Sequence, residues 1–145
     1  MRSCYDFVKK FKNKYPLTIA FRIKKHSDII DKHLNPDEEI IYAFAAQKNN
    51  DSFDIVNTNV IALTNKRLMI ATKRLLWGYF LVSITPDLFN DLTVSKEMIW
   101  GKVQIDTVKE TVTLSNVDPK ALPEIETSIT EYMMEEKKKY KERED

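Results

Sequence analysis

The feature that most constrains the fold is a series of short alternating segments between residues 39 and 115, with no helical pattern among them. Apolar and polar side chains alternate there with the period of two that a half-buried strand requires. Seven strands are predicted, at about residues 39–47, 59–63, 67–72, 79–84, 88–95, 102–106 and 111–115. Asn65 and Lys66 are interpreted as a hairpin turn in which asparagine takes the left-handed conformation. Short strands at regular spacing indicate an antiparallel meander that closes into a barrel or a sandwich.

Helical spacing flanks this region on both sides. Two short amphipathic helices are predicted before it, one over residues 3–14 and one that begins after Pro16 and ends near residue 34. Their apolar stripes are Phe7, Val8, Phe11 and Tyr15, and then Ile19, Ile23, Ile30 and Leu34. A third amphipathic helix is predicted after Asp118, which can cap it, and Pro119, which suits its first position. The tail over residues 135–145 is almost wholly charged and is expected to extend this helix or to fray.

Length and composition favour one globular domain with a basic head. A chain of 145 residues supports a single core, and the longest apolar stretch is too short for a spanning helix. Residues 1–34 hold nine Lys and Arg but only three Asp, whereas the remainder is acidic. The lone cysteine, Cys4, has no disulfide partner within the chain, and no signal-peptide pattern is present. We therefore expect a cytoplasmic setting, with Cys4 as an incidental surface or half-buried thiol.

Catalysis has little support in the sequence. Only two glycines are present, so no glycine-rich phosphate loop and no nucleophile elbow can be written. His26 and His33 are seven residues apart on a predicted helix, about 10.5 Å along its axis, which is too far to share one metal ion. His26 lies on the same helix face as Ile23 and Ile30 and is interpreted as a half-buried packing residue. No enzyme activity, cofactor or metal is expected, and a small hydrolase with an unrecognised site is the least favoured alternative.

A short internal repeat is the strongest candidate for a binding surface. The letters LLWG at residues 75–78 and MIWG at residues 98–101 both fall at predicted turns. In a meander, the connections after the third and fifth strands lie at the same end of the sheet, which would bring the two tryptophans near each other. The candidate ligand or partner surface is Lys73, Arg74, Trp77, Tyr79, Trp100 and Lys102. The alternative left open is that both indoles fold inward and close the barrel mouth.

Three segments resemble the bacterial pleckstrin-homology (PH) domains of the YokE type. They are NPDEEI at 35–40, ALTNKRLMIA at 62–71, and IWGKVQI at 99–105 followed by NVDP at 116–119. The resemblance covers about residues 35–134 and leaves residues 1–34 outside as a basic amphipathic helical extension. It implies a mostly β fold with α: a seven-stranded antiparallel, partly open PH-like barrel capped by a C-terminal helix.

The resemblance also implies a binding role rather than a reaction. The basic phosphoinositide motif of eukaryotic PH domains lies in the first hairpin, but residues 48–54 hold one lysine and two aspartates here, which argues against phosphoinositide recognition. The leading hypothesis is a non-catalytic interaction module that binds a protein partner or a second copy of itself. The contact would use the extension, an open sheet edge or the tryptophan turns.

The alternative is a peripheral adaptor at the inner face of a membrane. The basic helices and the tryptophan turns would then contact anionic lipid. The residues that the extension offers to a membrane or to a dimer partner are Phe7, Lys10, Phe11 and Lys14. Nucleic acid is the least favoured partner, because the barrel region is acidic and no strand interleaves aromatic and basic side chains.

Overall fold

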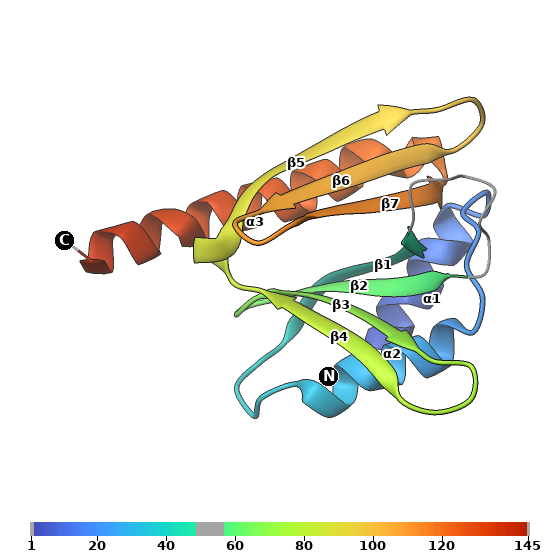
Figure 1. Ribbon diagram of the computed structural model, residues 1–145, viewed down its shortest axis with the longest axis horizontal. Helices are drawn as coiled ribbons and strands as arrows, with labels where there is room; N and C mark the ends of the chain where they lie inside the picture. Colours follow the sequence, from blue (N-terminus) through green and yellow to red (C-terminus); the bar gives the residue numbers. More distant parts are fainter. Residues whose placement is uncertain (1, 49–56, 145) are drawn as a thin grey trace.

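The computed structural model describes residues 2–48 and 57–144 (Figure 1). The helices are α1 (Cys4–Lys14), α2 (Ile23–His33) and α3 (Leu122–Glu144). The strands are β1 (Ile40–Lys48), β2 (Thr58–Thr64), β3 (Leu68–Lys73), β4 (Tyr79–Ile84), β5 (Phe89–Lys96), β6 (Gly101–Thr107) and β7 (Thr111–Val117). Short 3₁₀ turns at Pro86–Leu88 and Pro119–Ala121 precede β5 and α3. No helix among these residues is long and apolar enough to cross a bilayer.

The strands form one antiparallel sheet that is only partly closed into a barrel. Their order is β4-β3-β2-β1-β7-β6-β5, so β4 and β5 are the two edge strands. The pairs Gln47–Ser115 and Lys48–Leu114 join β1 to β7 at one end only. Beyond that point the halves β1–β4 and β5–β7 diverge, as Figure 1 shows. The predicted seven-stranded, partly open barrel with a C-terminal helix is confirmed.

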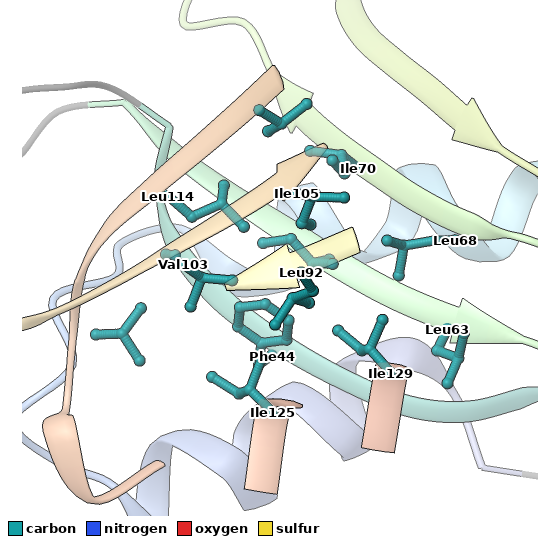
Figure 2. Close-up of a cluster of buried hydrophobic side chains, with 14 of the residues drawn as sticks. Phe44, Leu63, Leu68, Ile70, Leu92, Val103, Ile105, Leu114, Ile125 and Ile129 are labelled. Atoms are coloured by element: carbon teal, nitrogen blue, oxygen red, sulfur yellow. The ribbon is translucent and has the colours of Figure 1, made fainter. Parts of the chain in front are cut away.

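The inner core lies between the two halves of the sheet and α3. Phe44 on β1, Ile105 on β6 and Leu114 on β7 point toward one another from different strands (Figure 2). Ile125 and Ile129 of α3 enter the same cluster, one helical turn apart. All five side chains are fully buried. The helix therefore fills the space that the diverging halves leave open.

A second core lies on the opposite face of β1–β3, beneath α1 and α2. Val8 of α1 and Ile30 of α2 are fully buried there. They pack over small strand residues, including Ala43, Ala45 and Ala62, which let the helices approach the sheet closely. The predicted extension thus covers the sheet, and its lysines are exposed except for the half-buried Lys12. The apolar stripes of α1 and α2 therefore pack on the barrel.

The second helix begins later than the sequence predicts. It starts at Ile23, and residues 16–22 pass across the end of the sheet without forming a helix. The Leu17 and Ile19 N–H groups donate to Asp118 Oδ2 (3.3 Å) and the Asn116 carbonyl (2.9 Å). The Phe21 N–H donates to Thr58 Oγ1 at 3.1 Å. Because partners distant in sequence satisfy these donors, the segment gains nothing from helical hydrogen bonds.

The turn at Asn65 and Lys66 is present, but not for the predicted reason. The described non-glycine residues with positive φ are Arg22 (54°) and Asn116 (61°), so Asn65 is not left-handed. Instead, its side-chain oxygen accepts from the Glu39 N–H at 2.8 Å. The asparagine is used to tie the β2–β3 turn to the segment that leads into β1.

Candidate functional site

The histidines and the cysteine are structural groups. His26 is 3% exposed rather than half-buried, and its Nδ1 accepts from the Lys73 N–H at 2.7 Å. Burial, followed by the charge of Arg22, lowers the pKa of His26 to about 4. Cys4 is fully buried, contrary to the prediction, and burial raises the pKa of its thiol to about 12. A thiol with this pKa is a poor nucleophile at neutral pH.

No metal site emerges from the part of the chain that the structure describes, where no three His, Cys, Asp or Glu side chains are grouped to hold an ion. His33 donates from Nδ1 to the Ile29 carbonyl at 2.8 Å, and its Nε2 lies 3.0 Å from the Tyr79 hydroxyl. Tyr79, a predicted surface residue, is therefore half exposed and linked to α2. Its role is at least partly structural.

The turn between β3 and β4 projects three apolar side chains into solvent. Leu75, Leu76 and Trp77 are 80%, 77% and 73% exposed. The Arg74 N–H donates to the Gly78 carbonyl at 3.0 Å, and Gly78 has a φ of 82°, which favours glycine. The turn is closed by the backbone, so none of the three apolar side chains is needed to build it. The inward alternative is wrong for Trp77.

The turn between β5 and β6 has a similar sequence but a different construction. Met98 and Ile99 are 93% and 54% exposed, whereas Trp100 is half-buried and donates from Nε1 to the Leu17 carbonyl at 3.0 Å. Gly101 is required for close approach, because a Cβ there would lie 2.8 Å from a methyl carbon of Leu122. Both turns carry an exposed apolar pair, but only the first exposes its tryptophan.

The two turns lie at the same end of the molecule, as predicted (Figure 1). They belong to opposite edges of the sheet, because β3–β4 and β5–β6 stand at the two ends of the strand order. Residues 17–21, which include the half-exposed Leu17 and Phe21, also lie at this end. We call the exposed residues Leu17, Phe21, Leu75, Leu76, Trp77, Phe80, Met98 and Ile99 the apolar end.

Basic side chains stand beside the apolar end. Lys73 Nζ donates to the Gly78 carbonyl at 3.1 Å, and the Arg74 guanidinium lies 5.3 Å from the Phe80 ring centroid. Neither forms an ion pair with a residue that the structure describes. Lys102, in contrast, pairs with Glu97 at 3.6 Å. The candidate set therefore splits between the two turns, and the unpaired cations belong to the first.

Several residues of this surface were not predicted from the sequence. Leu75, Leu76, Met98 and Ile99 were visible as turn residues, but their exposure was not assigned. Phe21 and its neighbour Arg22 were missed because the segment was expected to be helical. Six apolar residues at two predicted turns were the available signal, since turn residues are usually polar. The predicted lack of a phosphoinositide motif concerns residues 48–54, which lie outside the described residues except for Lys48.

The four candidates on the N-terminal extension line one hollow of about 260 Å³ between α1, β1 and α3. Phe11 is 3% exposed and belongs to the inner core, so it offers no surface to a membrane or a partner. Lys14 pairs with Glu124 at 2.6 Å. Burial raises the pKa of Glu124, but hydrogen bonds from Lys14 and two tyrosines hold it below its ordinary value. Phe11 and Lys14 anchor α1 to α3, whereas Lys10, Lys14 and the half-buried Phe7 retain solvent contact.

Comparisons with known proteins agree with the architecture. The sequence model of a family described as bacterial PH domain matches residues 34–131. A crystal structure of a pleckstrin homology domain from Shewanella amazonensis SB2B matches with a TM-score of 0.54 and 15% sequence identity. The match covers 76% of this chain and 96% of that one, and at this identity it shows the fold alone. No curated protein matches. The YokE subtype stays a prediction.

Proposed function

The chain belongs to the bacterial PH domain family, and from that premise we propose that it is a non-catalytic interaction module that docks its apolar end on anionic membranes. PH-like domains are generally non-catalytic interaction modules. The observation that carries the membrane proposal is the exposure of apolar side chains on two separate turns. Such exposure has no use within the monomer and is typical of an interaction surface.

The arrangement of the two turns favours a flat, apolar occupant. They project at the same end of the molecule from opposite edges of the sheet, so a planar surface can touch both (Figure 1). Leu75, Leu76 and Met98 are each more than three-quarters exposed, and so they stand out from the body of the domain. Tryptophan is favoured at the membrane–water interface, where Trp77 would lie.

The charges at this end suit an anionic surface. Lys73, Arg74 and Arg22 lie beside the apolar end and have no carboxylate partner among the described residues. Each basic residue near an anionic leaflet contributes about 1 kcal/mol to binding. The attraction is screened by salt, because the Debye length falls as ionic strength rises. The proposal therefore requires vesicle binding that depends on both lipid charge and salt.

Sedimentation with vesicles tests this proposal. The full chain should pellet with phosphatidylcholine vesicles that contain phosphatidylglycerol, less so at high salt, and not with phosphatidylcholine alone. The double variant Leu75→Ser/Trp77→Ser should bind at least about tenfold more weakly, since burial of each side chain is worth about 1.5–3 kcal/mol. The matched control is Val108→Ser, which changes a 63% exposed apolar residue in the β6–β7 turn. That turn lies at the opposite end of the molecule (Figure 1).

No pelleting of the wild-type chain, or equal pelleting of the double variant, would contradict membrane docking. Removal of residues 1–34 would not test the contribution of these residues to membrane binding alone. The helices in that segment supply Val8, Phe11 and Ile30 to the two cores. Their loss would expose the outer face of β1–β3, and any change in binding would then reflect damage to the fold.

Self-association through β4 is a second candidate, and a difference between the two edge strands favours it. β4 (Tyr79–Ile84) contains no charged residue and no proline. It pairs with β3 on one side, and its other side is an edge of the sheet. β5 is protected: its pairing is irregular between Phe89 and Asp91, and Lys137 Nζ donates to the Phe89 carbonyl. Charges and bulges are the usual means of preventing edge pairing. The unprotected edge can add the β4 strand of a second copy.

Analytical ultracentrifugation over a range of protein concentrations tests the second candidate. The wild-type chain should move toward dimer mass as concentration rises. Ser83→Lys, which introduces a charge at an exposed position of β4, should stay monomeric. Thr93→Lys, at an exposed position of β5, is the matched control and should behave as wild type. A wild-type chain that is monomeric throughout, or a Ser83→Lys variant that still dimerises, would exclude β4 pairing.

A further inference from the structure

A hollow of about 510 Å³ lies beneath the β3–β4 turn, between that turn and the start of α2. This volume falls within the range of about 300–1,000 Å³ that small-molecule sites occupy. Its apolar lining comes from Phe21, Leu75 and Phe80, which are all exposed. Three aromatic or aliphatic side chains thus border one concave surface without packing into either core.

The same hollow is lined by Arg22, Lys73 and Arg74. The two arginines contact uncharged groups: Arg22 Nη1 lies 3.4 Å from the Lys73 carbonyl, and Arg74 covers the Phe80 ring. None of the three pairs with a carboxylate that the structure describes. Concentrated positive charge in a concave site with apolar walls attracts anions.

The start of α2 adds to this positive potential. Arg22 is the N-cap residue of an 11-residue helix, its side chain makes no capping hydrogen bond, and the first turn contains no acidic residue. The first N–H groups of a helix lack intrahelical partners and carry partial positive charge. Arg22 and His26 both line the hollow, so this helix end borders it. Anions bind readily at such a position.

We propose that this hollow binds a single-chain anionic amphiphile, with its headgroup at Arg22 and the start of α2 and its chain against Phe21, Leu75 and Phe80. The proposal rests on the proposed function, because the membrane that the apolar end contacts is the source of the lipid. Phe21, Arg22 and His26 precede residue 34, where the family match begins. The site is therefore formed jointly by the extension and the family domain.

Titration with dodecyl phosphate below its micelle concentration tests the site in the absence of a membrane. Binding is measured by calorimetry. The full chain should bind dodecyl phosphate at least about tenfold more tightly than inorganic phosphate or the uncharged dodecyl maltoside. Inorganic phosphate lacks the chain and dodecyl maltoside lacks the charge. Each comparison isolates one half of the proposed recognition.

Two variants locate the site. Arg22→Gln and Phe80→Ala should each weaken binding about tenfold, through loss of a charged hydrogen-bond donor and of apolar contact respectively. Lys109→Gln, at an exposed basic position in the distant β6–β7 turn, is the control and should leave the affinity unchanged. Thermal unfolding of each variant confirms that it is folded before its affinity is compared.

Equal affinity for dodecyl phosphate and dodecyl maltoside would overturn the inference, and so would wild-type affinity in folded Arg22→Gln and Phe80→Ala variants. Vesicle pelleting without dodecyl phosphate binding would overturn this inference and leave membrane docking intact. Dodecyl phosphate binding without vesicle pelleting would support the site and overturn membrane docking.

Discussion

His26 joins α2 to β3 by a single hydrogen bond that depends on its protonation state. Its Nδ1 accepts from the Lys73 N–H at 2.7 Å, and only an unprotonated ring nitrogen can accept. The ring is 3% exposed, so protonation would also place a charge in a poorly solvated position. Both effects favour the neutral imidazole in the folded chain.

The stability of the protein should therefore fall as the solution becomes acidic. The pKa of histidine is about 6.5 in an unfolded chain, and that of His26 is about 4 in the folded one. Between these values the unfolded chain binds more protons, so the contribution of His26 is complete above pH 6.5 and is lost as pH falls toward 4. The loss reaches about 3 kcal/mol.

Urea unfolding at several pH values between 7.5 and 4.5, compared with the His26→Gln variant, measures this contribution. Glutamine keeps an oxygen that can accept from the Lys73 N–H but does not titrate. The wild-type chain should lose stability more steeply than the variant below pH 6.5. Parallel curves for the two proteins would show that His26 does not control the pH dependence.

The same residue type can be required for different structural reasons at two positions, which limits what sequence alone predicts at this scale. The repeat LLWG and MIWG correctly indicated two turns. Gly78 is needed for its positive φ, which is a local property, whereas Gly101 is needed because Leu122 approaches it. Contact with a residue that is distant in the chain cannot be predicted from the local sequence around Gly101. The unequal exposure of Trp77 and Trp100 was hidden for the same reason.

The approach of α3 to β6 gives a prediction at the scale of elements. In Gly101→Ala, the new Cβ would lie 2.8–2.9 Å from three side-chain atoms of Leu122 at the start of α3. Overpacking of this kind costs about 1–3 kcal/mol, because the helix or the strand must shift. Urea unfolding should show that loss of stability. A variant as stable as the wild-type chain would mean that Leu122 can move without cost.

The strands were predictable because their signals are local. The alternation of apolar residues gave all seven with errors of one or two residues at most ends, and β4 was predicted with the correct bounds. The start of α2 was not predictable. The Leu17 N–H donates to Asp118, which is 101 residues away in the chain. Periodicity within a short window cannot report such a partner, so the letters of residues 16–22 resembled a helix.

At the scale of the whole molecule, the sequence predicted the barrel but not the position of its basic head. The resemblance over residues 35–134 implied a partly open seven-stranded barrel with a C-terminal helix, whereas residues 1–34 had no such guide. Two amphipathic helices with an apolar face and a basic face can cover a sheet or contact a partner equally well. In this chain the helices cover the sheet, because its outer face carries small apolar residues such as Ala43 and Ala62.

The two halves of the sheet are synthesised one after the other, and this affects which apolar surface is exposed while the chain is still incomplete. α1, α2 and β1–β4 are contiguous in the first part of the chain, so their contacts are available early during synthesis. The join at Gln47–Ser115 and Lys48–Leu114 must wait for β7, and the inner core must wait for α3. Until then the inner faces of Phe44 and Ile61 lack their partners. Because α1 and α2 cover the outer face, a nascent β1–β4 sheet would expose apolar side chains to chaperones and to neighbouring chains on its inner face.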